Sequence, residues 1–294
     1  MSFYLSIERV LNKILAPADV VVARQSRLDS ENQGHLLARL ADNARLIGSH
    51  GACEAFFAFA REVMKGQADS EISDFMHFYA KHYHKSRSQW AQDIFVLYAT
   101  KLKSGGSYLE IGGADGLTHS NTLALRDVLG WSGVLIEPDP EMFQLLKASR
   151  GHTDQVIHAA ISPDGNIGES LLRRAGQLSA LVGHEGRDSH SQTRAQQEST
   201  TKVSLLALTE IIRSRPRIDY FSLDVEGAEL SILRSIQWNE ITPPGLITVE
   251  HNYRPVEKEG LKQLLSQNGY VEYFSEHDWL RKGDLWMRHR DYLP

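Results

Sequence analysis

The chain has 294 residues, a length that allows one large α/β domain with an extension or two small domains. Its 41% hydrophobic and 23% charged residues are ordinary for a soluble globular protein, and its net charge of −5 provides no basic excess for binding nucleic acid. The single cysteine, Cys53, excludes an intramolecular disulfide framework and a cysteine-based zinc cluster.

The sequence also carries no sign of a membrane segment. No stretch approaches the roughly 20 apolar residues that a membrane helix needs. Residues 1–9 lack the positively charged segment and long apolar run that begin a secretory signal. We therefore expect no membrane span and a cytoplasmic protein.

Helical periodicity dominates the first part of the chain. Apolar residues recur at helical spacing near residues 3–15, 33–46 and 52–65. We expect residues 1–85 to form a helical extension, acting as a cap or a dimerisation layer, and residues 86–294 to form an α/β domain. Whether the protein is a homo-oligomer stays open. Residues 74–92, rich in histidine and tyrosine, either face a substrate or cofactor or form a solvated helix face.

The stretch Ser107–Gly116 predicts a strand followed by a tight glycine turn. Apolar residues between Tyr108 and Ile111 indicate a short buried strand, and Thr118–Asn121 offer capping side chains for a helix after the turn. A dinucleotide fingerprint beginning at Gly112 would need glycine at 114 and 117, where the chain has alanine and leucine. The pattern that fits, acidic-x-Gly-x-(Gly/Ala)-x-Gly, resembles motif I of class I methyltransferases, which bind S-adenosylmethionine; it consists of Glu110, Gly112, Ala114 and Gly116.

A second predicted strand, Gly133–Glu137, ends on an acidic residue, and Pro138 follows it. In nucleotide-binding α/β folds, an acidic residue at this place hydrogen-bonds ribose hydroxyls. The alternative is a surface glutamate before a proline turn. A third strand is expected over Gln155–Ile161, so that its end, at Ala160, flanks the adenine.

The pattern changes after the third strand. Residues 165–183 carry leucines on both sides of Gly176, which predicts a small hairpin. Residues 183–200 are polar and too long for an ordinary connector, so they form either a mobile lid over the active site or a disordered loop.

Four more strands complete the predicted sheet, over residues 218–223, 246–250, 271–274 and 285–287. Seven strands with an antiparallel last strand match the sheet of class I methyltransferases, a Rossmann-like α/β fold. Sites in such sheets gather at the carboxyl ends of the strands. Acidic residues stand at four of these ends: Glu110, Glu137, Asp224 and Glu250.

These segments together resemble one family. Tyr108–Gly116, Ser120–Thr122, Gly130–Pro138 and above all Ser222–Leu230 are similar to the FkbM family of S-adenosylmethionine-dependent O-methyltransferases. The resemblance covers about residues 88–285 and implies methyl transfer to a hydroxyl of a sugar, glycan or natural product. The residues expected to bind S-adenosylmethionine are Glu110, Gly112, Gly113, Asp115, Gly116, Asn121, Glu137, Pro138, Ala160 and Asp224.

The chemistry of methyl transfer suggests the catalytic residues. A hydroxyl has a pKa far above 7, so a base or a metal at the oxygen helps its attack. Asp224 is placed to face the methyl group, and His251, just past the fifth strand, is the neutral-pH base of that neighbourhood. Alternatively, Asp224, Glu250 and Asn252 form a set of oxygen ligands suited to Mg²⁺. The expected catalytic residues are therefore Asp224, Glu250 and His251, with both schemes open.

Two further acidic residues follow Asp224 closely. Glu226 and Glu229 lie two and five residues after it, so on a helix beginning at once the three carboxylates cannot face one point. The bland alternative is that Glu226 and Glu229 begin this helix favourably at its positive end.

Two other functions stay open. A nicotinamide-dependent oxidoreductase would have the same general fold, but the glycine spacing argues against it. A non-catalytic binding protein that kept the methyltransferase fold is the other alternative, and the acidic strand ends argue against that.

Overall fold

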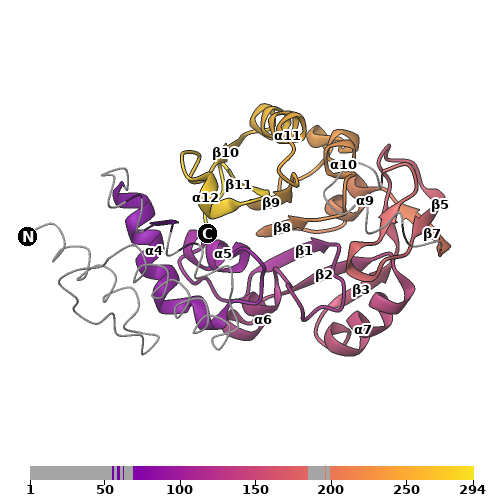
Figure 1. The fold of residues 1–294 in the computed structure, drawn as a ribbon, viewed down its shortest axis with the longest axis horizontal. Coiled ribbons are helices and arrows are strands. Elements are labelled where there is room, and N and C mark those ends of the chain that lie inside the picture. The colour runs from indigo at the N-terminus through magenta and orange to yellow at the C-terminus, as the bar shows by residue number, and fades with distance from the viewer. Residues whose placement is uncertain (1–54, 56–57, 60–61, 63–68, 185–195, 197–198) are drawn as a thin grey trace, which may run out of the picture.

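The computed structural model describes residues 55, 58–59, 62, 69–184, 196 and 199–294, which are coloured in Figure 1. Most of the predicted helical extension and most of the polar segment 183–200 lie outside the described residues. In the described part, a seven-stranded sheet forms the centre, helices cover both its faces, and a smaller sheet lies beyond one edge (Figure 1).

The main sheet has the strand order β10-β11-β9-β8-β1-β2-β3. Its parallel strands are β1 (Ser107–Ile111), β2 (Ser132–Glu137), β3 (Gln155–His158), β8 (Tyr220–Leu223) and β9 (Leu246–Glu250). The strand β11 (Asp284–His289) runs antiparallel to both β9 and β10 (Tyr270–Glu272). This confirms the predicted seven-stranded sheet, and it brings the carboxyl ends of β1, β2, β8 and β9 to the same end of the sheet.

Alternating side chains give the sheet two apolar faces, each covered by helices. Tyr108, Leu135 and Trp286 belong to the core on one side, where the helices are α4 (Ser70–His82), α5 (Gln92–Ala99), α6 (Leu123–Leu129) and α7 (Pro140–Arg150). Leu109, Phe221 and Val249 belong to the core on the other side, with α9 (Leu208–Arg213), α10 (Glu229–Ser235) and α11 (Pro255–Gln267). Short helices are η2 (Tyr83–Lys85), η3 (Gly176–Leu178), η4 (Trp238–Glu240) and α12 (Asp278–Arg281).

The helix α4 is the best described part of the predicted extension, and it packs on the sheet domain. Phe75 of α4 lies with its ring 4.9 Å from that of Phe274, and Phe95 of α5 stacks on Trp286 at 4.9 Å. Aromatic pairs of this kind add to the free energy gained by burying their area. None of the helices in the described ranges is both long and apolar enough to span a membrane.

A second sheet, in the order β4-β7-β5-β6, follows β3 in the chain. Its strands are β4 (Ala160–Ile161), β5 (Gly168–Arg173), β6 (Ala180–Leu181) and β7 (Thr200–Leu206), and β5 and β6 form the hairpin predicted over residues 165–183. The expected third strand over 155–161 is divided between the two sheets. The reason is that β2 ends at Glu137, opposite His158, so Ala160 finds its partner in β7 instead.

A buried guanidinium joins β1, α7 and the loop after the glycine turn. Arg150 Nε donates to Asp154 Oδ2 at 2.9 Å, and Arg150 Nη2 donates to the Tyr108 hydroxyl at 2.7 Å. Its Nη1 donates to the carbonyl of Gly116 at 3.1 Å. A buried charge of this kind is tolerated only when its hydrogen-bonding groups are satisfied. Arg150 therefore holds the loop to the sheet.

Replacing this guanidinium should destabilise the fold strongly. Arg150→Met leaves the buried carboxylate of Asp154 without its cation, so we expect the free energy of unfolding to fall by about 3–5 kcal/mol. Urea denaturation measures the change. The matched control is Arg213→Met, which removes an exposed ion pair with Glu210 and should change stability by about 0–1 kcal/mol. Similar small changes in both variants would contradict the structural role of Arg150.

Candidate active site

A cavity of about 390 Å³ lies at the carboxyl ends of β1, β2, β8 and β9. This volume is within the range of small-molecule sites in proteins. Its lining includes the glycine turn after β1 and the β5–β6 hairpin of the second sheet. The predicted cofactor residues that line it are Glu110, Gly112, Gly113, Asn121, Glu137, Pro138, Ala160 and Asp224.

The glycine turn brings β1 against the end of β8. Gly112 has a φ of +85°, and a Cβ there would lie 1.9 Å from the carbonyl oxygen of Asp224, so only glycine fits. Gly116 and Asp115, also expected at the cofactor, are absent from the described lining of the cavity. Gly116 packs on Arg150, and Asp115 accepts hydrogen bonds from the backbone N–H groups of Leu117 and Thr118. These two residues stabilise the glycine turn without lining the cavity in the described structure.

Glu137 stands at the end of β2 with its carboxylate fixed by backbone donors. Oε2 accepts from Ala114 N at 2.8 Å and Oε1 accepts from Asp139 N at 2.8 Å. Burial raises the pKa of Glu137 to about 7, although these two hydrogen bonds act to lower it. The carboxylate therefore connects the glycine turn after β1 with the turn that begins α7.

Asn121 presents an unsatisfied acceptor on the side of the cavity formed by β1 and β8. Its Nδ2 donates to the Ser222 hydroxyl at 2.9 Å, and its backbone N donates to Glu110 Oε1 at 2.9 Å. Its Oδ1 has no hydrogen-bond partner among the described residues, although the residue is only 9% exposed. A buried acceptor of this kind is unfavourable unless a ligand donates to it. The Glu110 carboxylate accepts hydrogen bonds from the Asn121 backbone and, at 2.6 Å, from the Thr122 hydroxyl.

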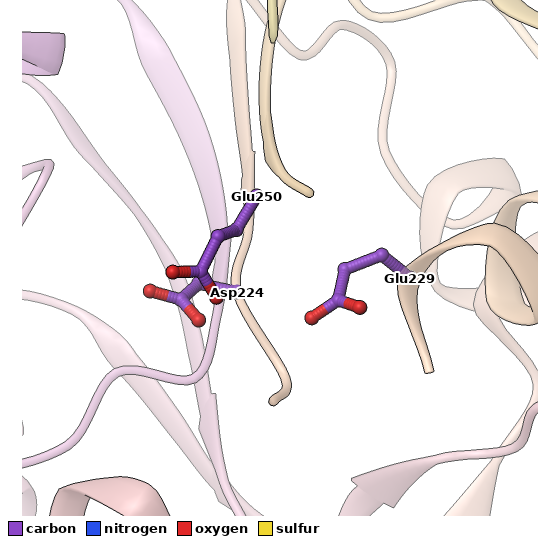
Figure 2. A group of neighbouring side chains, drawn as sticks. All are labelled: Asp224, Glu229 and Glu250. Carbon is purple, nitrogen blue, oxygen red and sulfur yellow. The ribbon is translucent and has the colours of Figure 1, made fainter. Parts of the chain in front are cut away.

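Three carboxylates meet at the ends of β8 and β9. Asp224 directly follows β8, Glu250 ends β9, and Glu229 begins α10. One oxygen from each lies within 4.8 Å of the others. Figure 2 shows Asp224 and Glu250 side by side, with Glu229 pointing toward them from the opposite side. The spacing and the oxygen donors are suited to a hard cation such as Mg²⁺.

Glu229 joins this group although no site role was predicted for it from sequence. The expectation assumed a helix beginning directly after Asp224, but α10 begins only at Glu229. Glu226, with φ of +61°, and Gly227, with φ of +119°, form a bend before it. The Glu229 carboxylate then accepts from Val225 N at 3.0 Å and Gly227 N at 3.1 Å.

A fourth carboxylate, Asp284 at the start of β11, pairs in register with Glu250. Its Oδ2 accepts from Gln92 Nε2 at 2.7 Å. Burial and then the charge of Asp224 raise the pKa of Asp284 to about 7, and burial likewise raises the pKa of Glu229 to about 7. The same two causes raise the pKa of Glu250 well above its ordinary value. The cluster therefore carries more negative charge than its surroundings compensate.

The other two residues expected here lie differently. His251 is buried but does not line the cavity in the described structure, and both of its ring nitrogens lack a hydrogen-bond partner among the described residues. Burial, together with the charges of Lys258 and Arg281, lowers the pKa of His251 to about 4. Asn252 Nδ2 donates to Glu250 Oε2 at 2.8 Å, so its amide supports a carboxylate of the cluster.

Reasoning from sequence missed Glu229 and Asp284, although signals for both exist. Gly227, between Asp224 and Glu229, indicates a turn or loop there, so that the helix begins after it. Asp284 begins β11, which runs antiparallel to β9. The first residue of an antiparallel strand lies beside the last residue of its neighbour, here Glu250.

The strand order and the cavity at the carboxyl ends define a class I methyltransferase fold. A sequence model described as "Methyltransferase FkbM domain" matches residues 110–292. The chain therefore belongs to the FkbM methyltransferase family. No curated protein matches the chain.

Three of the solved structures similar to this one are described as methyltransferases. An FkbM methyltransferase from Methylobacillus flagellatus KT has a TM-score of 0.44 and 14% identity, covering 78% of this chain and 59% of that chain. This chain thus spans about three fifths of that protein. A precorrin-6y C5,15-methyltransferase from Geobacter metallireducens GS-15 has a TM-score of 0.36 and 9% identity, covering 66% of this chain and 84% of that one. A methyltransferase from Pyrococcus furiosus has a TM-score of 0.38 and 11% identity, covering 68% and 81%.

The raised pKa of Glu137 predicts a specific pH dependence of stability. Its pKa is about 7 in the folded protein and ordinarily 4.5, so ionisation opposes folding. Its contribution to stability is fully present below about pH 4.5 and is lost as the pH rises through about 7, a change of roughly 3 kcal/mol. Urea denaturation from pH 4.5 to 8 should show a shallower decline for Glu137→Gln than for the unmodified protein. Glu210→Gln, at an exposed position on α9, should keep the original slope. Equal slopes for Glu137→Gln and the unmodified protein would refute this assignment.

Proposed function

We propose that this protein transfers the methyl group of S-adenosylmethionine to a hydroxyl of a sugar, glycan or other small natural product. The observation that supports it most is the group of carboxylates Asp224, Glu229 and Glu250, of which Asp224 and Glu250 line the cavity of about 390 Å³. Family membership alone supports methyl transfer, and the hydroxyl acceptor is our inference from the resemblance and from this group.

The cavity residues fit the cofactor along the direction of the sheet. Glu137 and Pro138, at β2, lie beside Ala160 and the hairpin, which suits the ribose and adenine. Asn121 and Asp224, at β1 and β8, lie on the other side, which suits the amino-acid end. The unsatisfied Asn121 Oδ1 would accept a hydrogen bond from the α-ammonium group. In this arrangement the carboxylate cluster faces the sulfonium, which is a favourable charge pairing.

The carboxylates would also act on the acceptor. S-adenosylmethionine, when bound, supplies an electrophilic methyl group. Asp224 and Glu250 would hold the acceptor hydroxyl in line with it and take the proton from the oxygen. Burial and like charge raise the pKa of Glu250, which makes it a stronger base than an ordinary glutamate.

The proposal also includes a divalent cation bound by the carboxylates. Asp224, Glu229 and Glu250 would hold Mg²⁺, with Glu229 replacing Asn252 in the set expected from sequence. A bound cation would lower the pKa of an acceptor hydroxyl beside it. The backbone hydrogen bonds on Glu229 and the Asn252 amide on Glu250 would orient these ligands.

Cofactor binding tests the first part of the proposal. Calorimetry should detect binding of S-adenosylhomocysteine, the demethylated product, to the purified protein. Glu137→Ala should weaken it by roughly 1–3 kcal/mol, because a charged acceptor of the ribose hydroxyls is lost. Turnover with a panel of sugars, glycans and natural products separates an enzyme from a binding protein. A protein with no affinity for S-adenosylhomocysteine would contradict the proposal as a whole.

Chelation tests the cation. EDTA should abolish turnover and Mg²⁺ restore it, and Glu229→Gln should raise the Mg²⁺ concentration for half-maximal rate about tenfold or more, since one charged ligand is lost. Asp127→Asn, at an exposed position on α6, is the control and should leave that concentration unchanged.

If EDTA does not affect turnover, the mechanism requires no cation, and a carboxylate acting as a base remains. Glu250→Gln should then lower turnover by roughly 10²–10⁴-fold with little effect on cofactor affinity. A loss of that size in His251→Ala, with Glu250→Gln unaffected, would instead favour the histidine expected from sequence.

A further inference from the structure

The buried leucines of the β5–β6 hairpin lie outside the two large cores of the main sheet. Leu172 and Leu181 form a small cluster with Ala160 and Val203, whereas Ile161 of β4 belongs to the core that contains α9, α10 and α11. The β5–β6 hairpin supplies much of the cavity wall: Leu172, Gln177, Leu178, Ser179, Ala180 and Leu181 line it. Backbone pairing with β7 joins the hairpin to the rest of the second sheet, and side-chain contacts join it to α7.

Polar contacts with the start of α7 hold the hairpin in place. Arg174, directly after β5, donates from Nε to Asp139 Oδ2 at 3.3 Å and pairs from Nη2 with Glu141 Oε1 at 2.7 Å. Ser179 Oγ lies 3.0 Å from the same Asp139 oxygen and 2.7 Å from the carbonyl of Gly176. A serine hydroxyl has one proton to donate between these two acceptors. Arg174 is thus the firmer link between the hairpin and Asp139.

Asp139 in turn is connected to the residue proposed to bind ribose. Its Oδ1 caps α7 by accepting from Glu141 N at 2.9 Å and Met142 N at 3.2 Å. Its own N–H donates to Glu137 Oε1 at 2.8 Å. One buried aspartate therefore joins three parts: the hairpin, the first turn of α7 and Glu137.

We infer that Arg174 is a positioning residue for the cofactor: by binding Asp139 it holds the β5–β6 hairpin as the wall against which the adenosine part packs. This inference rests on the proposed placement of adenosine between β2, β4 and the hairpin. Arg174 does not line the cavity in the described structure, so it acts through the hairpin and through Asp139. Loss of Arg174 lowers the fraction of molecules in which the hairpin is in its binding position. The apparent affinity for the cofactor falls in proportion to that fraction.

The test compares two ligands in calorimetry. S-adenosylhomocysteine contains both ends of the cofactor, whereas 5′-methylthioadenosine lacks the amino-acid end. Arg174→Met, which keeps an unbranched apolar stem but removes the guanidinium, should weaken both ligands by the same factor, about tenfold. Arg174→Lys, which keeps a cation, should recover affinity to within about threefold of the unmodified protein. Asn121→Ala should weaken S-adenosylhomocysteine and leave 5′-methylthioadenosine unchanged.

Two further measurements separate positioning from general damage. Amide hydrogen exchange should become faster in the hairpin, residues 168–181, of Arg174→Met and stay unchanged in β1 and β8. In turnover, KM for S-adenosylmethionine should rise about tenfold with kcat nearly unchanged, because the carboxylate cluster is untouched. Arg213→Met, the exposed ion-pair control on α9, should alter neither affinity nor exchange in the hairpin.

Each outcome decides between the claims. If the unmodified protein binds neither ligand, the proposed function fails. If it binds both and Arg174→Met binds them equally well, the proposed function stands and the role of Arg174 is wrong. A loss in Arg174→Met confined to S-adenosylhomocysteine would also overturn it, because the defect would then lie at the amino-acid end.

Discussion

Buried charge behind the glycine turn is the constraint on which the cavity depends. Arg150 and Glu110 lie out of water, so protein groups must satisfy their hydrogen bonds. Asp154 and the Tyr108 hydroxyl bind Arg150. The remaining groups come from one loop: the carbonyl of Gly116 and the hydroxyl of Thr122 for Arg150, and the Asn121 backbone and Thr122 hydroxyl for Glu110. These hydrogen bonds fix the conformation of the loop, and the loop in turn fixes the position of Asn121 at the cavity.

The features that follow from local patterns were predictable. Apolar strands ending on a charged residue indicate a buried parallel sheet, and the carboxyl ends of parallel strands must meet at one end. Glu110, Glu137, Asp224 and Glu250 could therefore be assigned to one region before any contact was known. The need for glycine at 112 was also visible, although the sequence could not say that the carbonyl of Asp224 is what a side chain would strike.

The features that depend on distant pairing were not predictable. Ala160 leaves the main sheet because β2 has already ended and β7, some forty residues on, offers a partner. Glu229 reaches Asp224 because a two-residue turn with positive φ precedes α10. Nor could His251 be placed: it follows Glu250 directly, and consecutive residues at a strand end point in different directions. Arg174 and Asp139, 35 residues apart, carry no local signal of their contact.

The carboxylate cluster is held together against its own repulsion. Backbone N–H groups bind Glu229 and the Asn252 amide binds Glu250, which holds both carboxylates near Asp224, and the Gln92 amide binds the neighbouring Asp284. In the free protein, raised pKa values mean that protons relieve part of the repulsion near neutral pH. A sulfonium, an ammonium or a divalent cation would then compete with protons for the same oxygens. The positions of Glu229, Glu250 and Asp284 rest on hydrogen bonds within the protein that do not depend on a ligand.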